Sequence, residues 1–190
     1  RRSPGQRVGV FGAGVQGRTQ LQAVAEVREL SGAVVYDVSA ETSSRFAEDM
    51  SAALHLPVRP ARKPEEAAEC DILCTATTSA TPLFEGRLLR PGTHINAVGS
   101  HTPGARELDS ETVRRARFIG DSREACFRES GDLIIPLREG TIGEGHFQAE
   151  LGQVVIGRAA GRTSDQEITL FKSNGLAVQD VAAARLVYEK

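Results

Sequence analysis

The chain has 190 residues, of which 40% are hydrophobic, and a formal net charge of −2. This length suits one domain, or one domain and part of another, and the hydrophobic content is sufficient for a buried core. Lys and Arg are spread among acidic residues, which gives no electrostatic basis for binding nucleic acid or a membrane surface. No signal peptide or apolar run of membrane length is present, so we expect a cytoplasmic protein.

The first predicted element is a buried strand over residues 8–11, which leads directly into a glycine-rich turn and a helix over residues 16–30. In this turn, Gly12 permits the change of direction, Gly14 lets the backbone approach a pyrophosphate, and Gly17 lets the helix lie close to the sheet. The free N–H groups at the helix N-terminus favour anions. These features predict a dinucleotide site formed by Gly12, Gly14, Val15, Gln16 and Gly17.

A second strand, over residues 33–37, ends in Asp37, twenty residues after Gly17. A carboxylate at this offset can accept hydrogen bonds from the hydroxyls of a ribose, and it would repel a 2′-phosphate. No Arg follows at once, because Val38 and Ser39 occupy the next positions. The sequence therefore favours NAD over NADP as the cofactor.

Strands and helices continue to alternate, which predicts an α/β fold with a doubly wound, mainly parallel sheet of the Rossmann type in three layers. Ser39 is expected to cap a helix over residues 40–54, and a further helix opens at residues 63–66. Beyond Leu133 the pattern is less regular: residues 140–145 read as a glycine-rich loop and residues 150–156 as a short helix or strand. The remaining strands are expected over residues 57–60, 72–76, 94–98, 117–120 and 167–172, and the remaining helices over 109–115, 122–129 and 176–188.

The three cysteines, Cys70, Cys74 and Cys126, do not have the spacing of a metal site. Cys70 and Cys74 lie around the start of a predicted buried strand, where a free thiol behaves as a small apolar residue. We therefore expect no metal centre.

Residues that follow the predicted strands are candidates for cofactor contact, because the carboxyl ends of parallel strands form the ligand crevice. Thr75, Ala76 and Thr77 follow one strand, and their small hydroxyl side chains can bond a ribose or phosphate; the alternative is an ordinary polar loop. The next strand is followed by Val98, Gly99 and His101.

Six sequence blocks together resemble the ornithine cyclodeaminase/mu-crystallin family. They are V-G-V-F-G-A-G-V-Q-G (8–17), C-T-A-T-T-S (74–79), G-T-H-I-N-A-V-G-S-H-T-P (92–103), R-E-L-D (106–109), A-E-L-G-Q-V-V-I-G (149–157) and E-I-T-L-F-K-S-N-G-L-A-V-Q-D (167–180). The resemblance extends through nearly the whole chain, and the order of the blocks is more specific than the glycine pattern alone.

The resemblance implies a two-domain protein in which an N-terminal substrate and dimerisation domain precedes the NAD(P)-binding Rossmann domain. Residues 1–190 would then be the Rossmann domain with its C-terminal return segment, without the substrate domain. A homodimer would form through the missing domain. We expect the isolated chain to bind the cofactor without meaningful catalytic activity. The final helix would pack its apolar side on the missing domain or on the sheet.

The resemblance also suggests roles for individual residues. Family members with cyclodeaminase activity resemble this chain but carry an aspartate at the position of His101, where it handles protons at the substrate carbon. Histidine can act there as a general acid or bind a carboxylate; the alternative is a solvent-facing loop residue. Lys172 and Ser173 match a stretch that closes over the nicotinamide, or they form a loop before the last helix. Arg106 and Glu107 are expected to order the loop after Pro103.

Three functions follow from the resemblance. The first is an NAD(H)-dependent oxidoreductase acting on a small amino or cyclic imino acid, as an imine reductase or amino-acid dehydrogenase. The second is a cyclodeaminase-type lyase that uses NAD catalytically and releases ammonia, with no net change in nicotinamide absorbance. The third is a protein that binds NAD(P)H and a small ligand without turnover.

Overall fold

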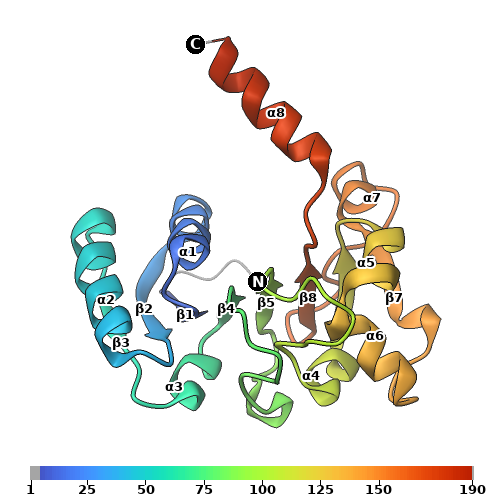
Figure 1. Ribbon diagram of the computed structural model, residues 1–190, viewed down its shortest axis with the longest axis horizontal. Coiled ribbons are helices and arrows are strands. Elements are labelled where there is room, and N and C mark those ends of the chain that lie inside the picture. Colours follow the sequence, from blue (N-terminus) through green and yellow to red (C-terminus); the bar gives the residue numbers. More distant parts are fainter. Residues whose placement is uncertain (1–4, 190) are drawn as a thin grey trace.

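The computed structural model describes residues 5–189, and its centre is one parallel eight-stranded sheet (Figure 1). The order across the sheet is β3-β2-β1-β4-β5-β8-β6-β7, and every pairing is parallel. The strands are β1 (Gln6–Phe11), β2 (Leu30–Tyr36), β3 (Val58–Pro60), β4 (Ile72–Thr75), β5 (His94–Ala97), β6 (Ala116–Gly120), β7 (Phe147–Glu150) and β8 (Ile168–Lys172).

Helices cover both faces of this sheet. They are α1 (Val15–Val27), α2 (Ala40–Leu54), α3 (Pro64–Ala68), α4 (Ser110–Arg115), α5 (Arg123–Glu129), α6 (Gly131–Arg138), α7 (Leu151–Val155) and α8 (Ala177–Tyr188), with 3₁₀ turns η1 (Gly86–Leu88) and η2 (Glu144–His146). Because side chains alternate along a strand, each strand supplies two cores. Val8 and Val10 of β1 belong to the core cluster that contains residues of α1 and α2, whereas Phe11 belongs to a second cluster that contains residues of α3 to α6.

The strand order reverses direction at β1. The chain first builds outward from β1 to β2 and β3, then crosses to place β4 on the other side of β1. Such a reversal leaves a crevice at the carboxyl ends of the two central strands, where ligands bind in open α/β sheets. The last strand, β8, returns from the far edge and inserts between β5 and β6. The three-layered, doubly wound fold expected from the sequence is confirmed.

Several element boundaries differ from those predicted. The first helix ends at Val27, short of Leu30, because Leu30 begins β2. The helix α6, with Pro136 inside it, extends into the less regular region beyond Leu133, and the strand β7 lies within that region. Pro disfavours a helix interior, but the buried side chains of Leu133 and Ile134 hold α6 against the core. The segment expected as a short helix or strand over 150–156 is the helix α7.

The last helix does not pack on the sheet. Figure 1 shows α8 projecting away from the rest of the domain, and none of its residues is buried. Its large apolar side chains are therefore exposed to solvent; they are Val178, Val181, Leu186, Val187 and Tyr188. Of the two alternatives that the sequence left open for this helix, the structure does not show packing on the sheet, and packing on another domain remains a prediction.

A mainly apolar groove of about 370 Å³ lies on the sheet towards the amino ends of the central strands. Apolar side chains of β4, β6 and α7, among them Ile72, Ile119 and Val154, line it. His94 of β5 also lines it, bonded to Thr169 Oγ1 at 2.8 Å, and burial lowers the pKa of this imidazole to about 4.

Cys70, Cys74 and Cys126 are free and buried, and burial raises the pKa of each thiol. Within residues 5–189, no three His, Cys, Asp or Glu side chains cluster in a way that could hold a metal ion. None of the helices in this described range is long and apolar enough to cross a membrane.

Gly9 sets the distance between β1 and α3. A Cβ atom at Gly9 would lie 2.1 Å from the carbonyl oxygen of Ala67 and 3.0 Å from a methyl group of Leu73. Gly9→Ala must therefore push α3 from the sheet, and overpacking of this kind costs about 1–3 kcal/mol. Urea unfolding measures this loss. Gly104→Ala is the control, since a Cβ there meets nothing within 4 Å; equal unfolding free energies for the two variants would contradict the prediction.

Candidate functional site

A cavity of about 530 Å³ lies at the carboxyl edge of the sheet, at the reversal between β1 and β4. Residues from five segments line it: α1, the loops after β4, β5 and β8, and the start of α8. They are Gln16, Gln20, Ala76, Thr77, Thr78, Val98, Gly99, His101, Ser173, Asn174, Gly175 and Gln179. The fold therefore brings together residues that are far apart in the sequence, at the place where an α/β sheet binds its ligand.

The glycine-rich turn lies beside this cavity, and each glycine has a different structural role. Gly12 has a φ of +95°, a conformation that disfavours side chains. At Gly17 a Cβ would lie 2.1 Å from the carbonyl oxygen of Gly12, so only glycine lets α1 begin this close to the turn. At Gly14 a Cβ would meet nothing within 4 Å. The missing side chain of Gly14 therefore leaves open space in front of the helix.

Among the residues that the structure describes, the N-terminus of α1 has no side-chain partner for its free N–H groups. Gly14 is the N-cap residue and offers no side-chain acceptor, and the first turn contains no acidic residue. Val15 and Gln16, in that first turn, are exposed. A helix N-terminus with uncapped N–H groups attracts an anion such as a phosphate.

Asp37 follows β2 and connects it to the glycine-rich turn. One carboxylate oxygen accepts a hydrogen bond from the Ala13 backbone N–H at 2.9 Å, and the other accepts one from the Ser39 N–H at 2.9 Å. The side chain is half-buried, so its remaining acceptor positions can face a ligand. The acid predicted from the sequence thus lies at the edge of the glycine-rich turn.

The loops after β4 and β5 share one buried acceptor, Glu107. Its carboxylate accepts hydrogen bonds from the Thr75 hydroxyl at 2.7 Å, from the Thr77 N–H and hydroxyl at 2.7 Å each, and from the Gly99 N–H at 3.0 Å. Thr75 is fully buried and bonded here, away from the cavity lining. Ala76, Thr77, Val98 and Gly99 line the cavity itself.

Lys172, which the sequence predicts to contact the cofactor, is buried behind the cavity lining. Its side chain is fully buried, with the ammonium 3.3 Å from Asp132 Oδ2 and donating to the Ser100 carbonyl. Asp132 in turn accepts from the backbone N–H groups of Glu107 and Leu108, at 2.8 and 3.0 Å. Burial raises the pKa of Asp132, and the Lys172 ammonium opposes that shift. Lys172 thus fastens the β5 loop to α6 and does not line the cavity.

The loop after β8 is held by a third buried acid, Asp121. One of its carboxylate oxygens accepts hydrogen bonds from the Ser173 hydroxyl at 3.1 Å and from the N–H groups of Asn174 and Gly175 at 2.7 and 2.8 Å. Ser173 remains part of the cavity lining, as expected from the sequence, and Asn174 and Gly175 join it.

His101 is exposed and lines the cavity. Its Nδ1 lies 2.9 Å from the Gly99 carbonyl oxygen, an arrangement in which Nδ1 carries the hydrogen and donates it. This bond fixes the tautomer of the neutral ring and leaves Nε2 free to accept or give a proton. His101 thus presents a ring nitrogen that has no hydrogen-bond partner among residues 5–189 and lies at the cavity lining.

Asp121 and Asp132 were not predicted from the sequence, and Glu107 was expected only to order the loop after Pro103. Asp121 and Asp132 share one signal in the sequence, which is an acid beside a run of apolar residues. Asp121 directly follows the apolar strand β6, and Asp132 directly precedes Leu133, Ile134 and Ile135. An acid that such neighbours carry into the core must find donors there, because an unpaired buried charge is costly.

The chain matches the ornithine cyclodeaminase/mu-crystallin family over residues 1–190. The structure of Thermococcus litoralis Delta(1)-pyrroline-2-carboxylate reductase, in complex with NADH and L-proline, superposes with a TM-score of 0.96 and 49% sequence identity, covering 99% of this chain and 58% of that one. A Delta(1)-pyrroline-2-carboxylate reductase of Bacillus cereus is 40% identical over 183 residues, covering 95% of this chain and 56% of the relative.

An alanine dehydrogenase of Archaeoglobus fulgidus is 39% identical over 184 residues, covering 95% of this chain and 55% of the relative. The chain thus spans a little over half the length of these relatives. Both the match over its whole length and the level of identity lead to one conclusion: the chain belongs to the ornithine cyclodeaminase/mu-crystallin family.

Proposed function

We propose that the chain is the cofactor-binding part of an NAD(H)-dependent oxidoreductase that acts on a small amino or cyclic imino acid. The observation that carries the proposal is a site with two adjacent parts, which meet at Gln16 in the first turn of α1. The glycine-rich turn and Asp37 form one part, and a cavity containing His101 forms the other. A dinucleotide has a matching shape, with a diphosphate and adenosine ribose at one end and a reactive ring at the other.

The described residues fit such a dinucleotide. The open space in front of Gly14 admits a diphosphate, the uncapped first turn of α1 supplies N–H donors, and Asp37 supplies an acceptor for ribose hydroxyls. The nicotinamide half would lie against the loops after β4, β5 and β8. When bound, the cofactor supplies or accepts a hydride, which no amino-acid side chain can do.

Reduction of a C=N bond requires a proton on nitrogen in addition to a hydride on carbon. His101 is the residue that we assign to this proton, because its Nδ1 is held by the Gly99 carbonyl and its Nε2 is free within the cavity lining. The cyclodeaminases that this chain resembles carry an aspartate where this chain has His101. We therefore favour an imine reductase or amino-acid dehydrogenase over an ornithine cyclodeaminase.

We further propose that a second domain completes the protein, binds the substrate and forms a homodimer. Two apolar surfaces support this: the exposed apolar side chains of α8, and the groove lined by Ile72, Ile119 and Val154. The relatives are also considerably longer than this chain. Three free buried thiols are compatible with the reducing cytoplasm that we propose as its location.

The test of the reaction uses the whole protein that contains this chain. Nicotinamide absorbance and ammonia are followed together with proline, alanine, ornithine and five- or six-membered cyclic imino acids. We expect net oxidation of NADH with an imino acid, or net reduction of NAD⁺ with the matching amino acid. Ammonia release from ornithine without a net absorbance change would instead identify a cyclodeaminase.

Gly14→Val should block the diphosphate while leaving the fold intact. The added Cβ would meet no atom of the protein within 4 Å, so the fold should tolerate it. The valine side chain would, however, fill the space that the diphosphate needs. We expect NAD⁺ affinity to fall at least about tenfold, which corresponds to about 1.4 kcal/mol, with an unchanged unfolding temperature. Calorimetric titration measures the affinity, and Gly104→Val is the control in an equally open exposed loop. Wild-type affinity in Gly14→Val would contradict the proposal.

Asp37→Ser should narrow the preference for NAD⁺ over NADP⁺. The substitution removes the carboxylate that bonds a ribose and repels a 2′-phosphate. Both affinities are measured by titration, and their ratio cancels any general effect on the turn that Asp37 also holds through Ala13. Asp165→Ser, at an exposed acid elsewhere in the domain, should keep the wild-type ratio. A wild-type protein that already prefers NADP⁺ would show that the assignment is incorrect.

A further inference from the structure

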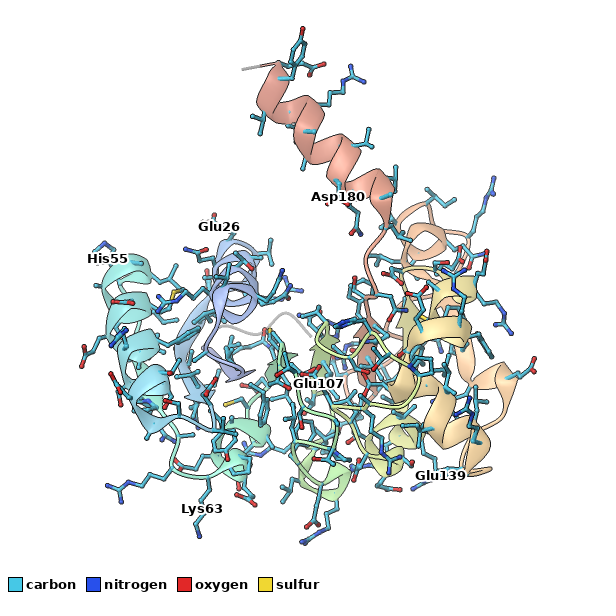
Figure 2. All side chains as sticks on the ribbon, viewed as in Figure 1. Glu26, His55, Lys63, Glu107, Glu139 and Asp180 are labelled. Atoms are coloured by element: carbon cyan, nitrogen blue, oxygen red, sulfur yellow. The ribbon has the colours of Figure 1, made fainter. Side chains whose placement is uncertain are left out.

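Glu107 is completely buried, and all the hydrogen-bond acceptor positions of its carboxylate are occupied. The residue is 0% exposed, and its two oxygens accept four hydrogen bonds, one from Thr75 at the end of β4 and three from the loops after β4 and β5. A carboxylate offers about four acceptor positions, so none is left for water or ligand. Figure 2 shows Glu107 in the middle of the molecule, where the left and right halves of the domain meet.

The backbone of Glu107 is fixed separately from its side chain. The N–H groups of Glu107 and Leu108 donate to Asp132 of α6, and Asp132 lies against Lys172 at the end of β8. The backbone that carries the carboxylate is therefore anchored to α6 and β8 by contacts that do not involve either loop. Such a group can set the position of the loops, whereas a loop side chain would move with them.

Contacts around Glu107 leave little room for adjustment. A Cβ at Gly99 would lie 2.4 Å from Glu107 Oε1, and a Cβ at Gly12 would lie 2.4 Å from the Ala76 carbonyl oxygen. The β5 loop is thus in close contact with Glu107, and the β4 loop with the glycine-rich turn. Thr77 is the one residue of the β4 loop that gives Glu107 both its N–H and its hydroxyl, and it lines the cavity.

We propose that Glu107 is a positioning residue for the nicotinamide half of the cofactor. It holds the loops after β4 and β5 at the separation that receives the ring, without touching the cofactor itself. The adenosine half depends instead on Gly14, α1 and Asp37, none of which shares a hydrogen bond with Glu107. The inference rests on the proposed NAD(H) binding, and it divides that binding into two halves that respond differently to one substitution.

Glu107→Gln tests this division. The amide has the same shape, but its NH₂ group would face backbone N–H or hydroxyl donors, so one of the two loops must move. We expect NADH affinity to fall roughly tenfold, the effect of one well-placed contact. The affinity for ADP-ribose, which lacks the nicotinamide, should stay within about twofold of wild type. The emission of bound NADH at saturation, which reports the surroundings of the reduced ring, should also change.

Two further variants complete the experiment. Glu139→Gln makes the same acid-to-amide change at an exposed side chain bonded to Ser110 and Arg106, and it should behave as wild type. Thr75→Val removes a single donor to Glu107 with little change in volume. Thr75→Val should weaken NADH binding and change the NADH emission less than Glu107→Gln does, again with ADP-ribose affinity unchanged. It takes the place of Glu107→Gln in the test if that variant does not fold.

The outcomes separate the inference from the function on which it rests. Unchanged NADH affinity and emission in Glu107→Gln, or equal weakening of NADH and ADP-ribose, would overturn the positioning role while wild-type binding stands. Failure of the wild-type chain to bind either nucleotide would overturn the proposed function, and this inference with it.

Discussion

The site depends on buried carboxylates that hold its loops. Irregular segments at the end of a sheet carry backbone N–H groups that the strand ladder no longer satisfies, and these groups need acceptors. Glu107 receives N–H groups from the loops after β4 and β5, and Asp121 receives two from the loop after β8. Asp132 secures the backbone of Glu107. The cavity therefore owes its shape to acids that lie behind its lining.

This arrangement concentrates negative charge in the core, and the buried ammonium of Lys172 lies beside it. Lys172 approaches Asp132 at 3.3 Å and bonds the Ser100 carbonyl. Burying charge is costly unless partners replace the lost water. Here each partner also connects two parts of the chain, β8 to α6 and α6 to the segment that carries Glu107. The same contacts thus offset the desolvation of the acids and join the elements that surround the cavity.

The sequence predicts what local pattern determines. Strand, glycine turn, helix and Asp37 follow one another within a short stretch, and each has a physical requirement visible in its residue type. Lys172 and Thr75 show where such reasoning ends, because both follow the expected pattern yet are bonded behind the cavity. Their respective partners, Asp132 and Glu107, are distant from them in sequence. The helix α6, which carries Asp132, also contains a proline, a residue that disfavours a helix interior. Only tertiary packing determines these features.

The most direct measurement is a crystal structure of this chain with NAD⁺. The account predicts the adenosine ribose within hydrogen-bond distance of Asp37 and the diphosphate in front of Gly14 at the N-terminus of α1. It predicts the nicotinamide between the Thr77 loop and His101, with the contacts of Glu107 unchanged. A nucleotide bound in the apolar groove at the other edge of the sheet, or no nucleotide at saturating concentration, would contradict the account.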